Sequence, residues 1–292
     1  MENLTKKKKV SFSQYASWFK CPHRWWLDYS QNKRIYDDSI NTCFGTAIHE
    51  ALQLYVQTLY TEGSSKADSL DLYKIFKEAF EKELKEKKVE VTEDDQTEFT
   101  FDGQDILSSF CSSGNRLKHF PSNKYEFIGV EVEMRVPIRQ NIDFVAYIDL
   151  VLKDKVTGHY KIIDFKTATN GWNQYQKEDE SKYSQLLLYK ALYSKQFNVP
   201  LSHISIEFFI VKRKLFENVA YPQSRIQNFV PTNNGPAVAK TLNGFAQFIN
   251  ECFTKEGDYK DDPSLYPKIP GNYKKNCKYC PHKKVNCDAK ES

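Results

Sequence analysis

Two strand-like runs joined by a short turn constrain the fold of this chain more than any other feature. The runs cover residues 144–152 and 160–166 and are rich in β-branched and aromatic side chains, which favour strands. The segment between them, 154–158, is mostly polar and ends in glycine, as hairpin turns commonly do. The pattern predicts a β-hairpin within a larger sheet.

Three ionisable side chains lie on this hairpin. Asp149 is in the first run, and Asp164 and Lys166 are two apart near the end of the second, so those two point to the same side of the sheet. Burying two carboxylates and a lysine is unfavourable unless another charge compensates them. Mg²⁺ or Mn²⁺, which prefer oxygen ligands, would do so, and Lys166 could orient a water or stabilise charge on a phosphate. The spacing fits equally well an ordinary hairpin with surface charges and one salt bridge.

A helix is expected over 183–197, after the hairpin, with Gln185 and Tyr189 four residues apart on one face. An aspartate, a hairpin, an Asp-x-Lys sequence and a helix with Gln and Tyr therefore occur in this order. This order resembles the RecB-like branch of the PD-(D/E)XK nuclease superfamily. The resemblance implies an α/β fold with a central mixed sheet flanked by helices, as in restriction endonucleases, and metal-dependent cleavage of DNA. Ala146 departs from the family pattern, which usually has glycine there, but alanine is also small.

A second helix is expected over 44–60, because its apolar residues recur at helical spacing. His49 lies beside this apolar stripe, with Gly45 one turn earlier. Helical side chains lean toward the N-terminus of the helix, so Gly45 is expected to leave open space for the His49 ring. The Gly-x-x-x-His sequence also resembles part of the RecB-like pattern, which implies that His49 is a metal ligand. An imidazole ligand favours Mn²⁺ over Mg²⁺.

Residues 126–136 alternate between apolar and polar side chains and predict a strand that feeds the hairpin. The family often has a glutamate here beside the metal. Glu131 fits that position better than Glu133, and the alternative is a solvent-exposed polar face.

The resemblance assigns roles to residues of all these elements. It implies a metal ion held by His49, Asp149, Asp164 and the backbone carbonyl of Phe165. The implied catalytic set is Asp149, Asp164, Lys166, Glu131, Gln185 and Tyr189, the last two positioning DNA.

Two segments outside the motifs have side chains suited to nucleic acid. In the loop expected after Lys166, Thr167 could contact a phosphate and Trp172 could stack on a base, or the loop is ordinary. Residues 212–214, Lys-Arg-Lys, end an expected strand and form either a phosphate-contact patch or a solvated turn.

Three cysteines lie close together near the end of the sequence. Cys277, Cys280 and Cys287 form a C-x₂-C-x₆-C pattern, which is a metal-site spacing. A zinc site could take His282 as its fourth ligand. A disulfide is disfavoured, because we expect an intracellular protein.

The resemblance offers a further alternative for these cysteines. Iron–sulfur members of the RecB-like branch hold a [4Fe–4S] cluster with one cysteine near the N-terminus and three near the C-terminus. Cys21, which precedes a proline as Cys280 does, matches the first of these. The cluster would then staple Cys21 to the segment 274–288 and join both regions to the nuclease core. The other three cysteines are expected in the core.

The bulk properties predict one globular protein without a membrane span. Charged residues make up 27% and hydrophobic residues 40% of the 292, and no run approaches the roughly 18 apolar residues of a membrane helix. Residues 1–10 read as a basic flexible tail without the apolar core of a signal peptide, so we expect a cytoplasmic protein of a bacterium or a phage. Residues 11–292 are expected to form one nuclease domain with a helical insertion at about 61–120, in which the acidic stretch 90–98 is a loop. The net charge of +4 permits a nucleic-acid partner without indicating one.

The expected function is a metal-dependent DNA exonuclease acting on single-stranded ends, in recombination, repair, CRISPR adaptation or phage DNA metabolism. The sequence has no G-x-x-x-x-G-K-[ST] motif and hence no helicase motor of that type, so helicase, recombination or CRISPR proteins are candidate partners. The alternatives are a structure-specific endonuclease and a non-catalytic DNA-binding subunit of the same fold. The complete His, Asp and Asp-x-Lys set argues against the last.

Overall fold

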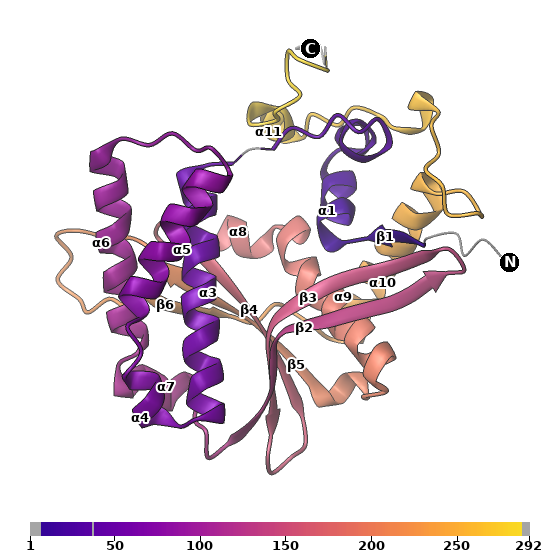
Figure 1. Cartoon of the computed structure of the whole chain (residues 1–292). Coiled ribbons are helices and arrows are strands. Elements are labelled where there is room, and N and C mark those ends of the chain that lie inside the picture. The colour runs from indigo at the N-terminus through magenta and orange to yellow at the C-terminus, as the bar shows by residue number, and fades with distance from the viewer. Residues whose placement is uncertain (1–6, 37, 288–292) are drawn as a thin grey trace, which may run out of the picture.

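A computed structural model describes residues 7–36 and 38–287. Within these residues six strands form one mixed sheet (Figure 1). The strands are β1 (Lys8–Val10), β2 (Tyr125–Arg139), β3 (Ile142–Asp154), β4 (Tyr160–Ala168), β5 (Ile204–Lys212) and β6 (Ile226–Phe229). Their order is β1-β3-β4-β5-β6, and β2 also pairs with β3. The expected α/β architecture with a central mixed sheet flanked by helices is confirmed.

The predicted hairpin is β3–β4, and it is only partly laddered. Antiparallel pairing joins 150–153 to 160–163 and then stops. Beyond that point β3 stays with β2, whereas β4 runs parallel to β5 over its whole length. The sheet therefore divides in the middle of β3, and the β2–β3 pair arches away from β4 and β5 in Figure 1.

One face of the sheet is covered by the long helix α3 and the helices that follow it. They are α3 (Ile40–Thr61), α4 (Ser64–Asp68), α5 (Leu72–Glu86), α6 (Glu93–Phe110) and α7 (Ser113–His119). Their apolar side chains form a core with Phe165 and Phe209 of the sheet. The segment expected as a helical insertion is thus a small bundle that lies against the sheet.

The acidic stretch 90–98 was expected as a loop, and this is wrong from Glu93 onward, where α6 begins. The Thr92 hydroxyl caps the helix by accepting a hydrogen bond from the Asp95 amide at 3.1 Å. Acidic residues in a first turn also interact favourably with the positive end of the helix dipole. The charges that resembled a solvated loop therefore start a helix.

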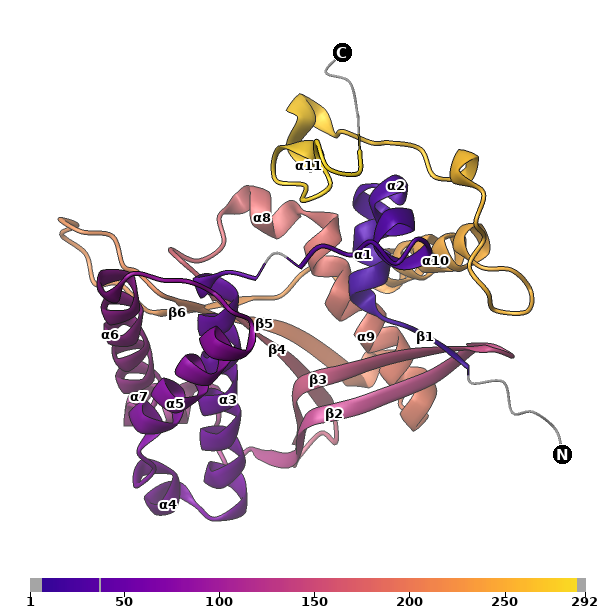
Figure 2. The same cartoon turned by 45° about the horizontal axis from the view of Figure 1, so that its top comes forward.

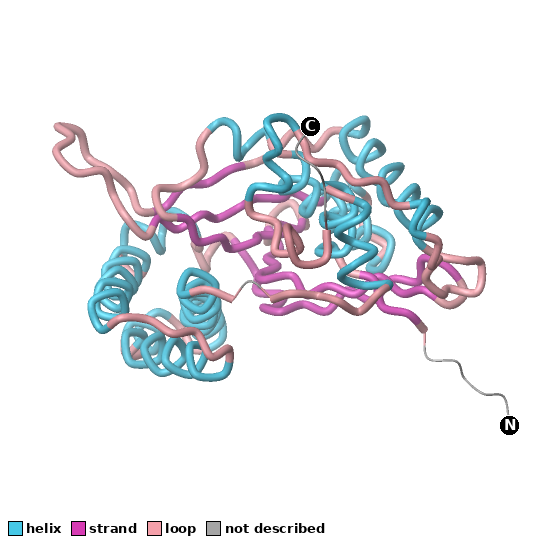
Figure 3. The backbone as a smooth tube through the Cα atoms, turned by 90° about the horizontal axis from the view of Figure 1, so that it is seen from above, coloured by secondary structure: helices cyan, strands magenta, loops and turns pink. Residues whose placement is uncertain are grey.

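Helices from distant parts of the sequence lie on the other side of the sheet. They are α1 (Phe12–Lys20), α2 (Pro22–Trp25), α8 (Gln174–Glu178), α9 (Glu180–Phe197), α10 (Gly235–Cys252) and α11 (Lys275–Lys278). Of these, α1, α9 and α10 supply nearly all of the helical side chains in the second core, in which Tyr15 and Phe245 meet edge to face. Figure 3 shows helices on both sides of the strands. No helix within the two described ranges is both long and apolar enough to cross a membrane.

Part of the expected N-terminal tail belongs to the sheet. Residues 8–10 form β1, which pairs in parallel with 142–144 of β3. Val10 is fully buried in the second core. Burial of this side chain and hydrogen bonding to the edge of β3 therefore stabilise a strand here, although the neighbouring lysines are charged. Residues 1–6 of the expected tail lie outside the described residues.

Candidate active site

The site begins where the β3–β4 ladder ends. Leu150 and Ile163 are the last paired residues, and the next position on β3 is Asp149. The Asp149 carboxylate accepts a hydrogen bond from the Phe165 amide at 2.7 Å. A longer ladder would have paired that amide with the β3 backbone. A side-chain oxygen therefore replaces a main-chain one, and the strands diverge on either side of two aspartates.

A cavity of about 830 Å³ lies between α3 and the end of β4. It follows the exposed side of α3 and the last residues of β4. Its walls include Asn41, Thr42, Gly45, Thr46, His49, Gln53, Glu131, Lys166, Thr167, Thr169 and Arg213. Residues separated by more than 170 positions in the sequence thus share one wall.

His49 of α3 lies at this wall with its Nδ1 3.8 Å from Asp149 Oδ2, and its ring meets Phe165 edge to face. Burial, and to a lesser extent the Lys166 charge, lower the pKa of His49 to about 4. The imidazole is therefore neutral at physiological pH and keeps the lone pair that metal coordination requires.

Asp164 and Lys166 of β4 form an ion pair, with Lys166 Nζ 2.6 Å from Asp164 Oδ2. Burial nevertheless raises the pKa of Asp164 to about 6, with a further contribution from the Asp149 carboxylate, and outweighs the opposing Lys166 charge. Burial also raises the pKa of Asp149 to about 6, against the opposing effects of Lys166 and the Phe165 amide. The protein thus holds two carboxylates in a place where both resist ionisation.

Glu131 of β2 is the glutamate beside these groups. Its neighbours Val130 and Val132 pair with Leu150 and Ile148, which places Glu131 opposite Asp149. Its backbone has a φ of 48°, in the left-handed region that is strained for a residue with a side chain.

Glu133, the alternative, binds Arg135 at 2.8 Å and is not among the residues that line the cavity. The structure therefore brings Glu131, and not Glu133, to the candidate site.

Gln53 is a site residue that the sequence reasoning missed. Its Nε2 donates a hydrogen bond to Glu131 Oε1 at 2.6 Å and lies 3.4 Å from the Asp149 carbonyl oxygen. It is one helical turn after His49, so both side chains are on the same face of α3. The four-residue spacing between His49 and Gln53 was the signal in the sequence. A glutamine on the helix face that presents the candidate ligand His49 can hydrogen-bond a second candidate residue, here Glu131.

Gln185 and Tyr189 approach the carboxylates from α9, on the opposite face of the sheet. Gln185 Nε2 donates to Tyr189 Oη at 3.2 Å, and the Tyr189 ring packs edge to face on Phe144. Burial raises the pKa of Tyr189, and the nearby Asp164 charge raises it further. The phenol stays protonated and can donate a hydrogen bond near the two aspartates.

Two expectations about individual residues are wrong. A Cβ on Gly45 would lie 2.9 Å from Thr167 Oγ1, so this glycine makes room for Thr167 of β4 rather than for His49. Trp172 is only 8% exposed and packs on Phe208 with a centroid distance of 4.9 Å. Its ring is part of the core, because the loop that carries it folds back onto the sheet, and it cannot stack on a base.

The donor set at the site suits a hard divalent cation. Two carboxylates that resist ionisation and a neutral imidazole gain from a positive ion placed between them. In residues 7–36 and 38–287 no three His, Cys, Asp or Glu side chains are already arranged around one point. Lys166 takes the position of a counter-charge to Asp164 instead.

The cysteines expected to bind a cluster lie in one region of the structure, but among the described residues no three of them are arranged around a common point. Burial raises the pKa of the Cys277 thiol, and the charges of Cys21, Cys280 and Cys287 raise it further, because all four sulfurs lie in one neighbourhood. The Ile269 amide lies 3.5 Å from Cys21 Sγ in the same region. Figure 2 shows this C-terminal segment lying over α1 and α2.

The zinc alternative with His282 as a ligand does not fit the structure. His282 is fully buried, with Nε2 2.7 Å from Asp28 Oδ1 and Nδ1 3.2 Å from Asn286 Nδ2. Both ring nitrogens are therefore engaged elsewhere. The four thiols remain as the candidate ligand set.

Comparison with known proteins places the chain in a family. The family model for the PD-(D/E)XK nuclease superfamily matches residues 9–287. Among solved structures, a candidate exonuclease from Eubacterium rectale is 12% identical, with a TM-score of 0.52 over 100% of this chain and 94% of the other. The structure of SSO0001 is 13% identical over 93% and 96% of the two chains, with a TM-score of 0.34, too low to support an inference. No curated protein matches. The match over most of the sequence shows that this chain belongs to the PD-(D/E)XK nuclease superfamily.

Proposed function

We propose that this protein is a metal-dependent deoxyribonuclease that hydrolyses phosphodiester bonds at single-stranded DNA ends. The observation that carries the proposal is that His49 and Lys166 line one cavity, and that each lies against a buried aspartate, Asp149 and Asp164 respectively. Membership of the nuclease superfamily supports the chemistry. The similar fold of the candidate exonuclease from Eubacterium rectale agrees with action at ends.

In this proposal His49, Asp149, Asp164 and the Phe165 carbonyl would hold Mg²⁺ or Mn²⁺. A bound ion supplies charge stabilisation for the phosphate and lowers the pKa of a water. The Phe165 amide holds the Asp149 carboxylate in place at 2.7 Å, and the lowered pKa of His49 keeps that ligand neutral.

Lys166 orients the attacking water and stabilises negative charge that develops on the phosphate oxygens. The water oxygen forms a bond to phosphorus while the opposite phosphorus–oxygen bond breaks, which leaves one end with a phosphate and the other with a hydroxyl. Glu131 lies beside this centre, and Gln185 and Tyr189 hydrogen-bond the DNA backbone from α9. These groups act by positioning the scissile phosphate.

We further propose that Cys21, Cys277, Cys280 and Cys287 hold a [4Fe–4S] cluster. Four thiolates are the ligand set of such clusters, and the four sulfurs share one neighbourhood. The cluster would fix the C-terminal segment to α1 and α2. Protein purified without oxygen should contain iron and sulfide, and Cys280→Ser should lose both and unfold at a lower temperature. Zinc in place of iron, or an unchanged iron content in Cys280→Ser, would contradict this assignment.

We propose that this activity is cytoplasmic and, by the family resemblance, that it serves DNA recombination, repair, CRISPR adaptation or phage DNA metabolism. A helicase, recombination or CRISPR protein would then supply the DNA end. The direct test is cleavage of linear single-stranded DNA labelled at each end in turn, and of a closed single-stranded circle, with Mg²⁺ or Mn²⁺. Cleavage of the linear strand alone is expected.

The matched controls are on the same strand of the sheet. Lys166→Ala and Asp164→Ala should each reduce cleavage about 100-fold or more. Lys161→Ala removes a lysine of β4 that binds Glu207 at 3.2 Å outside the cavity, and it should cleave normally. Cleavage of the circle would make the protein an endonuclease. Wild-type protein no more active than Lys166→Ala would make it a non-catalytic DNA-binding subunit.

A further inference from the structure

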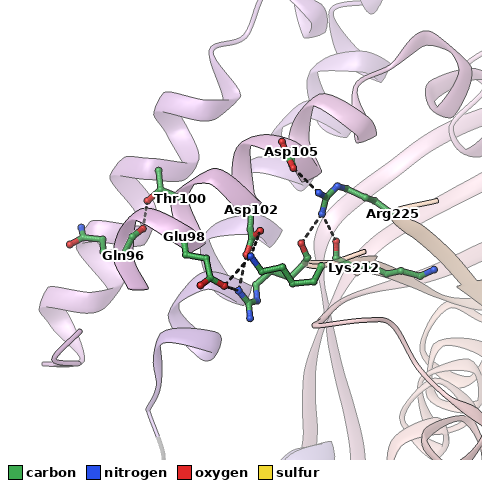
Figure 4. Close-up of polar contacts among 9 residues, drawn as sticks. Gln96, Glu98, Thr100, Asp102, Asp105, Lys212 and Arg225 are labelled. Carbon is green, nitrogen blue, oxygen red and sulfur yellow. Dashed lines mark hydrogen bonds and ion pairs between the residues drawn. The ribbon is translucent and has the colours of Figure 1, made fainter. Parts of the chain in front are cut away.

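An ion-pair network joins α6 to the end of β5, and Figure 4 shows its contacts. Glu98, Asp102 and Asp105 recur at helical spacing and share one face of α6. Arg213 Nη1 lies 2.7 Å from Asp102 and 2.9 Å from Glu98, and Lys214 Nζ lies 2.9 Å from each of these carboxylates. Asp105 pairs with the next cation along the chain, which is Arg225, at 2.6 Å.

The centre of this network is buried. The Arg213 side chain is 13% exposed and that of Asp102 is 8% exposed. The Arg213 guanidinium also lies 4.0 Å from the centre of the Phe99 ring. A buried pair with such partners resists opening, because removing one member leaves the other charged and desolvated. Glu98 and Asp105, at 49% and 63%, lie at the periphery.

The cations of the network are attached to the strand that carries the active site. The Arg213 amide donates to the Ala168 carbonyl at 2.9 Å, and the Lys214 amide donates to the Thr169 carbonyl at 2.7 Å. These bonds continue the β4–β5 pairing beyond the ends of both strands. The position of α6 is therefore fixed relative to Lys166, three residues from Thr169.

Arg213 also lines the active-site cavity, at the end where α6 lies. Along α3 the cavity extends from Gln53, next to Glu131, to Asn41. Arg213 packs on Phe99, which meets Phe44 of α3 edge to face. Phe44 precedes Gln53 by nine helical residues, or about 14 Å, so Arg213 and Glu131 lie toward opposite ends of the cavity. A DNA strand that follows the cavity along α3 would pass both residues.

At the Arg213 end of the cavity the cations already have acidic partners. Arg213 and Lys214, which the sequence offered as a phosphate-contact patch, are neutralised by Glu98 and Asp102. A strand passing here would have to break this network and bring phosphates next to two carboxylates, which repel them.

We propose that the Arg213–Asp102 network closes this end of the cavity and makes cleavage depend on a free DNA end. This inference rests on the proposed nuclease function and adds the structural element that excludes a continuous strand. A linear strand enters with its terminus toward Arg213 and stops there. A circle has no terminus and cannot reach Lys166.

The test opens the network without altering any proposed catalytic residue. The double variant Glu98→Gln with Asp102→Asn removes both carboxylates that face Arg213. The matched control is Asp105→Asn, which removes a pair between α6 and the β5–β6 segment outside the cavity. Wild type and control should cut linear single strands and spare circles. The double variant should cut circles at least about tenfold faster than wild type and retain its rate on linear DNA.

A binding measurement separates this inference from the nuclease proposal. In a Lys166→Ala background with Ca²⁺, circular and linear single strands compete for the protein against a fluorescent linear oligonucleotide. The circle should compete about tenfold less well with the closed network and equally well after the double substitution. If the double variant does not fold, as judged by circular dichroism, Glu98→Gln alone should shift the ratio in the same direction. Equal competition by circles before the substitution, or no gain from opening the network, would overturn the inference, whatever the cleavage assay shows.

Discussion

Replacing Asp164 by asparagine should stabilise the metal-free protein while abolishing cleavage. Burial raises the pKa of Asp164 from its ordinary value of 3.8 to about 6. At a pH between these two values, Asp164 keeps its proton in the folded protein but has released it in the unfolded chain. Stability contributed by this proton is therefore lost as pH rises from about 4 to about 6, and the penalty is complete above that range.

The magnitude follows from the difference between the two pKa values. It is about two pH units, and each corresponds to about 1.4 kcal/mol, so ionised Asp164 destabilises the fold by as much as about 3 kcal/mol at neutral pH. The opposing attraction of Lys166 is already contained in this value. Asparagine has no charge to desolvate. At roughly 2 °C per kcal/mol for a chain of this size, the melting temperature should rise by as much as about 6 °C.

The assay is thermal unfolding in EDTA from about pH 4 to about pH 8, and then with Mn²⁺. The gain of Asp164→Asn should disappear near pH 4, where the wild-type carboxyl is protonated too. Saturating Mn²⁺ should stabilise the wild type by about 3 kcal/mol at 100 times the dissociation constant and the variant by much less. With Mn²⁺ bound, the wild type should therefore be more stable than Asp164→Asn.

Asp154 provides the matched control, at the other end of the same hairpin. Its pKa is lowered, chiefly by a hydrogen bond from the Thr157 amide at 2.9 Å. Ionised Asp154 therefore stabilises the folded protein above the ordinary pKa of aspartate, and this stabilisation is lost as pH falls. Asp154→Asn should not stabilise the protein at any pH. A melting temperature of Asp164→Asn equal to or below that of wild type in EDTA near pH 8 would refute the reasoning.

Three further predictions test parts of the site. Gln53→Leu should free the Glu131 carboxylate and reduce kcat about tenfold with little change in melting temperature, measured by steady-state kinetics; an unchanged kcat would contradict a positioning role. Gly45→Ala should reduce activity by its clash with Thr167 Oγ1, and adding Thr167→Ala should restore it in part; no recovery in this double-mutant cycle would refute the contact. Cleavage at low metal concentration should fall below about pH 6, as both buried carboxylates are protonated, and should recover as Mn²⁺ is raised; a pH profile independent of metal would contradict metal ligation.

The hairpin and its ligand candidates could be predicted because their signals are local. β-Branched runs, a glycine-ended turn and the spacing of Asp149, Asp164 and Lys166 occupy about twenty neighbouring residues. His49 was predicted from family resemblance, since a single helical histidine carries no chemical signal of its own. The structure then places it 3.8 Å from Asp149 Oδ2.

Other features depend on contacts between distant segments and were not predictable from local patterns. The polar run around Trp172 resembles a loop, but burial of that ring against Phe208 is decided by the return of β5 beside β4. Gly45 has a packing role that depends on Thr167, more than a hundred residues later. Lys214 was expected either in a phosphate-contact patch or in a solvated turn, and Glu98 in an acidic loop, because neither segment shows that the other neutralises its charge. A run of charged residues therefore predicts solvent exposure only where no distant segment supplies side chains of opposite charge.

The division of the sheet at Asp149 explains why this site is built at the expense of stability. A continuous β3–β4 ladder would pair the Phe165 amide with backbone and leave no room for two carboxylates. Instead the protein places Asp149 and Asp164 where each resists ionisation, and places Glu131 on a strained backbone beside them. Each feature is unfavourable in the folded chain alone, and a divalent cation would offset the first two directly. Metal binding and folding should therefore be coupled at this site, so that neutralising Asp149 or Asp164 should abolish cleavage and relax the metal-free fold.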